Sequence, residues 1–314
     1  MNMGSIKSVF LGAVLCLGAL EVFGGVAAAQ PWAEASGKGS KTIFSLGTAA
    51  LHQFEADLDQ GGDFSVTRFF FDFGVTTPVT PQLGVGFGLN YAFDNYNISA
   101  VNILSNQAPW DNIHRFGVSG QVFYDMQNNW RFFFAPTVGW WGESDAKRSD
   151  SLMYGGIFSA VYTFGPRLTV GGGIGAFSRL EEFKAFPFIM VNWRITEQLS
   201  LRNPFRAGPA GPAGLELAYA PDQVWEFSVG GAFRSYRFRL SEDGPVANGI
   251  GEERAFPAYA RVARRFGRHV MLEFYGGVSF GGKLELEDQN GDELASDRYG
   301  TAPFLGLSIS GRLW

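Results

Sequence analysis

The sequence has little of what folded chains use for cross-links and charged surfaces. It contains one cysteine, Cys16, and only 18% of its residues are charged, against about 25% in ordinary soluble domains. An internal disulfide is therefore excluded. Neither sign of charge dominates, since 25 basic residues stand against 30 acidic ones, and the net charge of −5 argues against nucleic-acid binding, which needs a basic surface.

Long hydrophobic runs are also scarce beyond the first thirty residues. The longest uncharged run there, 73–93, is broken by Pro78 and Pro81 and by several polar residues, so it does not predict a transmembrane helix of about 20 apolar residues. What is abundant is glycine, with 42 residues, and phenylalanine, with 31. So many aromatic residues exclude a disordered chain.

The N-terminus carries the pattern of a secretory signal peptide. Lys7 precedes a wholly apolar segment, 9–20, and small residues follow at 27–29. The apolar segment is too short to span a membrane, and a buried N-terminal helix is the alternative. We predict a cleaved signal peptide over 1–29, which would remove Cys16, and a periplasmic extension over 30–41.

The remaining chain, 42–314, alternates apolar and small or polar residues with the two-residue period of β-strands. In 83–93, for example, every second residue is large and apolar and the residues between are Gly, Asn or Ala. This period predicts fourteen strands, or twelve if the short pair 199–203 and 214–220 is lost. The predicted strands are 42–57, 64–76, 83–97, 112–126, 131–142, 151–164, 168–179, 184–195, 199–203, 214–220, 224–240, 254–266, 269–286 and 298–314.

Three features favour a membrane barrel over a soluble sandwich. The strands are long, about ten to fourteen residues, as a tilted membrane strand requires. Tight turns such as 165–166 and 267–269 alternate with long polar loops such as 97–111 and 241–254. Tryptophans fall near predicted strand ends, as in an interfacial girdle. The expected fold is all-β: a closed antiparallel up-and-down transmembrane β-barrel in the bacterial outer membrane.

The same residues resemble bacterial outer-membrane β-barrel proteins. The nearest likeness is to an uncharacterised barrel family, a domain of unknown function, with a Pro/Gly-rich loop (203–212), a Gly-Leu-Glu-Leu strand (214–217) and a basic aromatic strand (233–240). The resemblance implies location and architecture rather than an activity. The last strand partly matches the signal read by the outer-membrane assembly machinery, although Trp314 is one residue out of phase with its apolar face.

The sequence offers little for catalysis or cofactors. Lipid-cleaving barrels place a His and a Ser two residues apart on one strand, but no serine lies two residues from His52, His114 or His269. No enzyme activity, catalytic residue or cofactor is therefore predicted. The run 288–293 has oxygen ligands at alternate positions, like the start of a calcium loop, but an Asn-Gly turn explains the same residues.

Charged residues on the inward face are the remaining candidate site. If the clear apolar faces meet lipid, Glu226, Arg261, Glu273 and Arg312 point into the lumen near the periplasmic ends of four successive strands. Their alternating signs predict a ladder of ion pairs. Three further residues could extend it: Arg68, Asp72 and Arg194.

We therefore expect a monomeric outer-membrane barrel that forms a narrow passage or binding lumen for a small solute. The alternative is a non-enzymatic surface-interaction or structural barrel of the envelope. Expected partners are outer-membrane lipids, the assembly machinery acting on the C-terminal strand, and a small solute, without nucleic acid.

Overall fold

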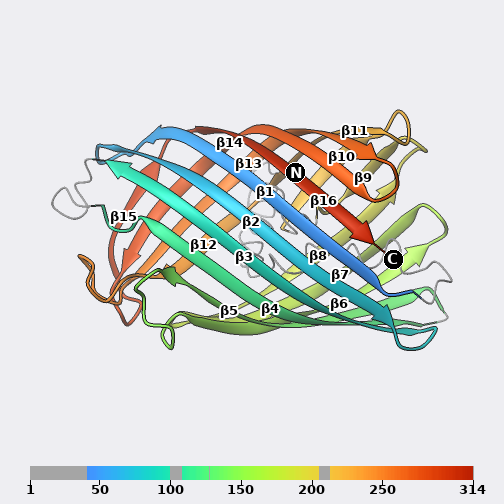
Figure 1. Cartoon of the computed structure of the whole chain (residues 1–314), viewed down its shortest axis with the longest axis horizontal. Coiled ribbons are helices and arrows are strands. Elements are labelled where there is room, and N and C mark those ends of the chain that lie inside the picture. The colour runs from blue at the N-terminus through green and yellow to red at the C-terminus, as the bar shows by residue number, and fades with distance from the viewer. Residues whose placement is uncertain (1–40, 100–107, 127, 205–212, 314) are drawn as a thin grey trace, which may run out of the picture.

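The computed structural model describes residues 41–99, 108–126, 128–204 and 213–313, and these residues form one β-barrel (Figure 1). The predicted signal peptide and all but the last residue of the predicted extension lie outside the described residues, as does Trp314. Within the described part, no helix has the length and hydropathy needed to cross a membrane.

Sixteen strand segments make up the described barrel. They are β1 (Ile43–Asp57), β2 (Asp63–Pro78), β3 (Leu83–Ser99), β4 (Asn112–Asp125), β5 (Trp130–Glu143), β6 (Leu152–Phe164), β7 (Leu168–Arg179), β8 (Glu182–Arg194), β9 (Leu199–Arg202), β10 (Gly214–Tyr219), β11 (Trp225–Ala232), β12 (Arg234–Arg239), β13 (Ile250–Phe266), β14 (Val270–Glu287), β15 (Glu293–Tyr299) and β16 (Ala302–Leu313).

Two pairs of these segments are single barrel strands with a short interruption. β11 and β12 both pair with β13 in one continuous register, and β15 and β16 do the same with β14. The sixteen segments therefore make fourteen strands. β1 pairs with both β2 and β16, which closes the sheet antiparallel throughout. The expected closed fourteen-stranded barrel is confirmed.

The short strands β9 and β10 decide against twelve strands. β9 pairs with β8 on one side and with β10 on the other, and β10 continues the sheet to β11. Two predicted boundaries were wrong: β13 begins at Ile250 rather than at 254, and β15 begins at Glu293 rather than at 298. Both strands are extended at the end opposite the chain termini, which is the external end if the termini lie in the periplasm.

The alternation of side chains separates a lipid face from a lumen face. Phe227 and Phe274 are 44% and 51% exposed on the outside, whereas their neighbours Glu226 and Tyr275 are 6% and 1% exposed inside. Large apolar residues cover the outside of every long strand in the same way. This is the pattern that a bilayer requires of a barrel.

Glycines on β7 let aromatic rings lie flat against the inner wall. A Cβ at Gly173 would meet the Phe188 ring at 2.4 Å, and one at Gly175 would meet the Phe186 ring at 2.3 Å. Because no side chain larger than hydrogen fits there, the two rings of β8 cover the backbone of β7. The glycine-rich run 171–175 is therefore a packing surface rather than a loop.

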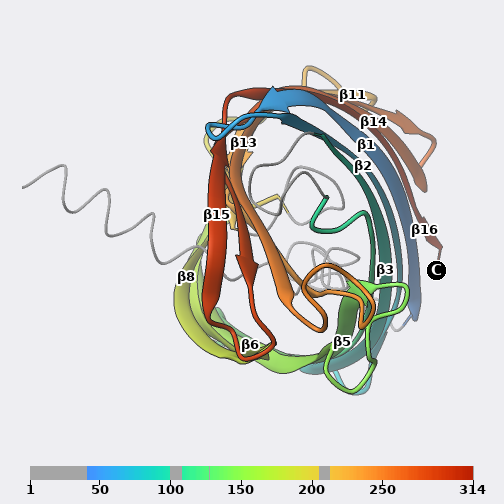
Figure 2. The same ribbon diagram turned by 90° about the vertical axis from the view of Figure 1, so that its left-hand side faces the viewer.

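At the external end, part of the sheet folds over the mouth of the barrel. We call this part the flap; it comprises β12, residues 250–254 of β13, residues 282–287 of β14, and β15. Arg239 at the tip of β12 forms a β-bridge with Gly142 of β5, a strand six places away around the ring in one direction and eight in the other. β12 thus crosses the lumen to the opposite wall, as the orange hairpin in Figure 2 shows.

Candidate functional site

The lumen has two chemically different walls. On β4 to β8 the buried inward side chains include a band of aromatic and aliphatic residues, with the polar Ser119, Gln121, Thr137 and Ser159 among them, whereas the wall from β9 round to β2 carries most of the buried charges. The inward apolar residues of the first wall, which we call the apolar wall, are Phe123, Phe133, Ala135, Ile157, Val161, Phe177, Phe186, Phe188 and Met190.

Arg261 is the centre of an ion-pair cluster near the periplasmic end of the charged wall. Its guanidinium lies 2.7 Å from Glu216, 2.5 Å from Glu226 and 2.9 Å from Glu273. Arg202 adds a second cation, 2.9 Å from Glu216 and 2.5 Å from Glu226. These five residues, the Arg261 cluster, come from β9, β10, β11, β13 and β14.

Small residues opposite the charges give the cluster its room. Glu226 and Glu273 both lie opposite Ala263 on β13, one from each side, and Glu273 lies opposite Ser308 on β16. Ser308 Oγ donates a hydrogen bond of 2.8 Å to Glu273, and the Tyr259 hydroxyl donates one of 3.2 Å to Glu216. Each carboxylate therefore accepts hydrogen bonds from several donors, as buried charges require.

The structure brings together three of the seven residues predicted for the ladder: Glu226, Arg261 and Glu273. The expected second arginine beside Glu273 was wrong, because the register places Ser308 there and puts Arg312 four residues further along, opposite Ser45. Arg194 is exposed at the periplasmic end of β8.

Sequence reasoning missed Arg202 and Glu216, which lie on the two shortest strands. The signal was present for Glu216, since Leu215 and Leu217 on either side are exposed on the lipid face and alternation then turns Glu216 inward. For Arg202, the four-residue strand was too short to show a face.

Arg68 belongs to a second cluster nearer the external end. It pairs with Asp94 at 2.9 Å and with Glu253 of the flap, while Arg115 pairs with Asp94 at 3.0 Å. The Tyr236 ring of the flap lies between the two guanidinium groups, 4.1 Å from that of Arg68 and 4.3 Å from that of Arg115. Asp72, also buried on β2, is influenced by the charge of Arg234 rather than by the Arg261 cluster.

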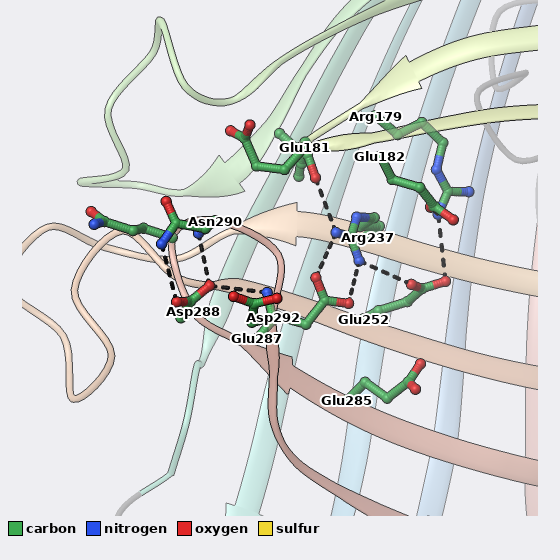
Figure 3. Close-up of polar contacts among 12 residues, drawn as sticks. Arg179, Glu181, Glu182, Arg237, Glu252, Glu285, Glu287, Asp288, Asn290 and Asp292 are labelled. Carbon is green, nitrogen blue, oxygen red and sulfur yellow. Dashed lines mark hydrogen bonds and ion pairs between the residues drawn. The ribbon is translucent and has the colours of Figure 1, made fainter.

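The flap is held across the mouth by its two buried arginines. Arg237 bonds both oxygens of Glu287 at 2.6 Å and Glu252 at 3.3 Å, so it ties neighbouring strands of the flap together (Figure 3). Arg239 reaches the wall, where it lies 2.9 Å from Glu181 and donates to the Asp150 carbonyl at 2.9 Å.

Beneath the flap the structure has a cavity of about 30 Å³, enough for about two water molecules. Its polar side is formed by Arg68, Arg234 and Glu253, and its apolar side includes Phe70 and Phe304. A space of this size has room for water but does not admit a larger solute.

A His–Ser contact that the sequence did not predict lies on the outside of the barrel. His114 Nε2 is 3.0 Å from Ser144 Oγ, and its Nδ1 is 2.8 Å from the Tyr91 hydroxyl. The serine comes from the end of the next strand, so a search along one strand could not find it. A tyrosine hydroxyl rather than a carboxylate holds Nδ1.

The 288–293 run forms a tight turn between β14 and β15. The Asp288 carboxylate accepts hydrogen bonds from the backbone N–H groups of Asn290 and Asp292 at 2.8 and 3.0 Å (Figure 3). The N–H groups of Asp292 and Asn290 hold the pKa of the Asp288 carboxyl below its usual range. Among the described residues, no group of three His, Cys, Asp or Glu side chains is arranged to hold a metal ion.

One known protein family matches most of the chain. The family described as Domain of unknown function (DUF6268) matches residues 83–310. The chain belongs to this family. The resemblance to an uncharacterised barrel family is thereby confirmed, and the DUF6268 match covers every residue of the Arg261 cluster. No curated protein matches the sequence.

Solved structures similar to this DUF6268 protein include outer-membrane proteins of low sequence identity. The COG4313 outer membrane channel from Pseudomonas putida F1 has 10% identity and a TM-score of 0.47, over 87% of this chain and 95% of that one. A Pseudomonas aeruginosa FadL homologue has 11% identity and a TM-score of 0.45, over 87% and 90%. LpxR from Salmonella typhimurium has 8% identity and a TM-score of 0.35, over 85% and 99%.

Proposed function

We propose that this protein lets small, largely apolar solutes cross the bacterial outer membrane through its lumen. A signal peptide delivers the chain to the periplasm, and the assembly machinery inserts the barrel by way of its C-terminal strand. The outer face then contacts outer-membrane lipids. The protein acts as a monomer and without a cofactor or enzymatic step.

The apolar wall is the observation that carries this proposal. Lipid requires apolar residues on the outside of a barrel only, and lumen faces are ordinarily polar. Here buried inward residues from Phe177, near the external end of β7, to Met190, near the periplasmic end of β8, are apolar as well. Such a lining favours a solute that gains by leaving water over one that must keep its hydration.

The charged wall keeps the lumen from packing into an ordinary hydrophobic core. The Arg261 cluster holds five charged side chains in fixed positions, which braces the periplasmic half of the charged wall. Arg265 lies 4.0 Å from Glu226 and brings the charges near this site to three positive and three negative. A balanced cluster of this kind gives no preference for anionic or cationic solutes.

Matched substitutions on the two walls test the proposal. Met190 lines the apolar wall, and Met271 lies on the inward face of the charged wall. Met190→Gln should weaken binding of benzene to the purified barrel about tenfold, because covering an unpartnered amide costs on the order of 1–2 kcal/mol. Met271→Gln should leave it unchanged. Saturation-transfer NMR measures both, with glucose as the polar comparison.

Equal effects of the two substitutions, or stronger binding of glucose than of benzene, would contradict an apolar path. The flap across the mouth favours a second candidate, a permanently plugged barrel with a structural or surface-interaction role. That candidate predicts no solute binding by the unaltered protein and no effect of either substitution.

A further inference from the structure

We propose that the flap is a gate, which closes the external mouth in the observed state and opens by swinging outward about a line of backbone irregularities. This inference rests on the proposed function, because a gate has meaning only if solute passes behind it. Two observations carry it: the hinge line and the polar character of the contacts at the tip.

The hinge line crosses four neighbouring strands at one level. The β11–β12 strand is interrupted at Phe233 and the β15–β16 strand at Gly300, while between them the β13–β14 register shifts at Ala255 and Gly281. Gly281 adopts a φ of 61°, which is in the left-handed region that favours glycine. A bulge such as the one between β13 and β14 bends a sheet locally, and together with the two strand interruptions at the same level it defines an axis about which the sheet can turn.

Aromatic rings follow the same line. The rings of Phe233 and Phe256 are 4.8 Å apart, and those of Phe256 and Phe280 are 6.0 Å apart. These three residues come from three adjacent strands and pack on one another rather than on the flap or the opposite wall. The hinge therefore keeps its own packing whether the flap is closed or open.

The leading edge of the flap is held mainly by polar contacts. Among the described residues, its only backbone bridge to the far wall joins Arg239 and Gly142. The side chains of Arg237 and Arg239 donate to the Leu180 carbonyl, at 3.0 Å, and to Glu181. Water can replace such partners when the contact opens, which is not true of apolar packing.

The flap also packs against the wall through apolar side chains, in one buried cluster that includes Phe238, Leu284, Leu286 and Tyr299 of the flap and Phe64, Trp110 and Leu180 outside it. Phe238 is fully buried, with its ring 5.3 Å from that of Trp110 and 6.1 Å from that of Tyr96. This packing stabilises the closed state, and the arginines determine the position of the tip against the wall. A permanent plug would instead be expected to have a ladder of backbone hydrogen bonds along this edge.

The turn that receives the tip is strained. Leu180 and Glu181, between β7 and β8, have φ values of 41° and 69°, both in the left-handed region that non-glycine residues avoid. Arg237 holds the carbonyl of the first residue, and Arg239 holds the carboxylate of the second.

Cysteine labelling from outside the cell tests the gate. Ser119 is 1% exposed on the inward face of β4, below the flap, and Ser119→Cys is a nearly isosteric reporter. Cys16 is replaced by serine so that no other thiol is present. We expect Arg239→Gln to raise the labelling rate by a membrane-impermeant thiosulfonate at least tenfold on intact cells, with folding checked by heat-modifiable gel migration.

Two further variants keep the experiment decisive. Glu181→Gln breaks the same ion pair from an exposed position of the wall and should raise labelling about threefold, even if Arg239→Gln fails to fold. Arg298→Gln removes an exposed charge from β15, away from the tip contacts, and should change nothing. Equal rates in all of these chains would overturn the gate.

A shortened flap separates failure of the gate from failure of the passage. Ser235 and Arg254 are register partners, so residues 236–253 can be replaced by an Asn-Gly turn. If this chain labels at Ser119→Cys and the tip variants do not, the flap is a fixed plug and the passage stands. If the shortened chain does not label either, no path exists behind the flap and the proposed function fails with it.

Discussion

At the scale of single residues, the Arg261 cluster shows how charged side chains are buried in a barrel lumen by pairing with one another. One guanidinium faces three carboxylates, and its side chain has no exposed surface. Each charge is costly to bury alone, so the members depend on one another. Removing Arg261 leaves three buried carboxylates and one arginine of the cluster, Arg202, which pairs with Glu216 and Glu226.

Arg261→Met should therefore destabilise the barrel by about 3–5 kcal/mol, the range found when one partner of a buried ion pair is removed. Arg312→Gln, an inward arginine at the rim, should cost no more than about 0.5 kcal/mol. Urea unfolding in lipid vesicles measures both. A double-mutant cycle of Arg261→Met with Glu273→Gln should give a coupling well above zero, and additive effects would contradict the cluster.

Sequence reasoning reached part of this site, because alternation assigns a face without knowing register. It placed Glu226, Arg261 and Glu273 inward, where the structure has them. It could not show that Arg312 lies beyond Ser308, since the offset between β14 and β16 is set by the turn between β14 and β15, and the sequence did not predict strand β15 before residue 298. Nor could it bring Ser144 to His114, which are joined only by the pairing of β4 with β5.

At the scale of the strand, the two-residue period of the sequence predicts most of the barrel strands and which face each residue takes. Phe274 and Tyr275 are adjacent in the chain but differ in exposure from 51% to 1%, because successive side chains face opposite sides. The same period continues through β12 and the start of β13, where both faces are buried. Alternation located β12 within the predicted strand 224–240 but missed residues 250–253 of β13, and it could not show that these external ends leave the wall.

Phe274→Arg should impair folding far more than Tyr275→Arg. An arginine on the lipid face costs about 2–4 kcal/mol near the bilayer midplane, whereas one at position 275 enters a lumen wall that already holds carboxylates. Refolding yields into phospholipid vesicles compare the two variants directly. Equal yields would mean that the strand is one residue out of register, since such a slip exchanges the faces.

At the scale of the whole molecule, one set of contacts closes the sheet into a ring and a different segment lies across the lumen. Pairing of β1 with β16 satisfies the backbone of the outermost strands and removes the sheet edge. The flap lies across the mouth and reaches Gly142 on the other side of the ring. A fourteen-stranded ring is too wide for its own side chains to fill, so blocking it takes a folded segment.

The measurement that tests the account most directly is uptake by intact cells that produce either the full chain or the chain with residues 236–253 replaced by an Asn-Gly turn. Entry of radiolabelled benzene and of glucose is followed in parallel, with cells lacking the protein as the baseline. A gated apolar passage predicts faster uptake of benzene in the shortened chain, with a smaller gain for glucose. Uptake at the baseline for both solutes, or a gain for glucose alone, would contradict it.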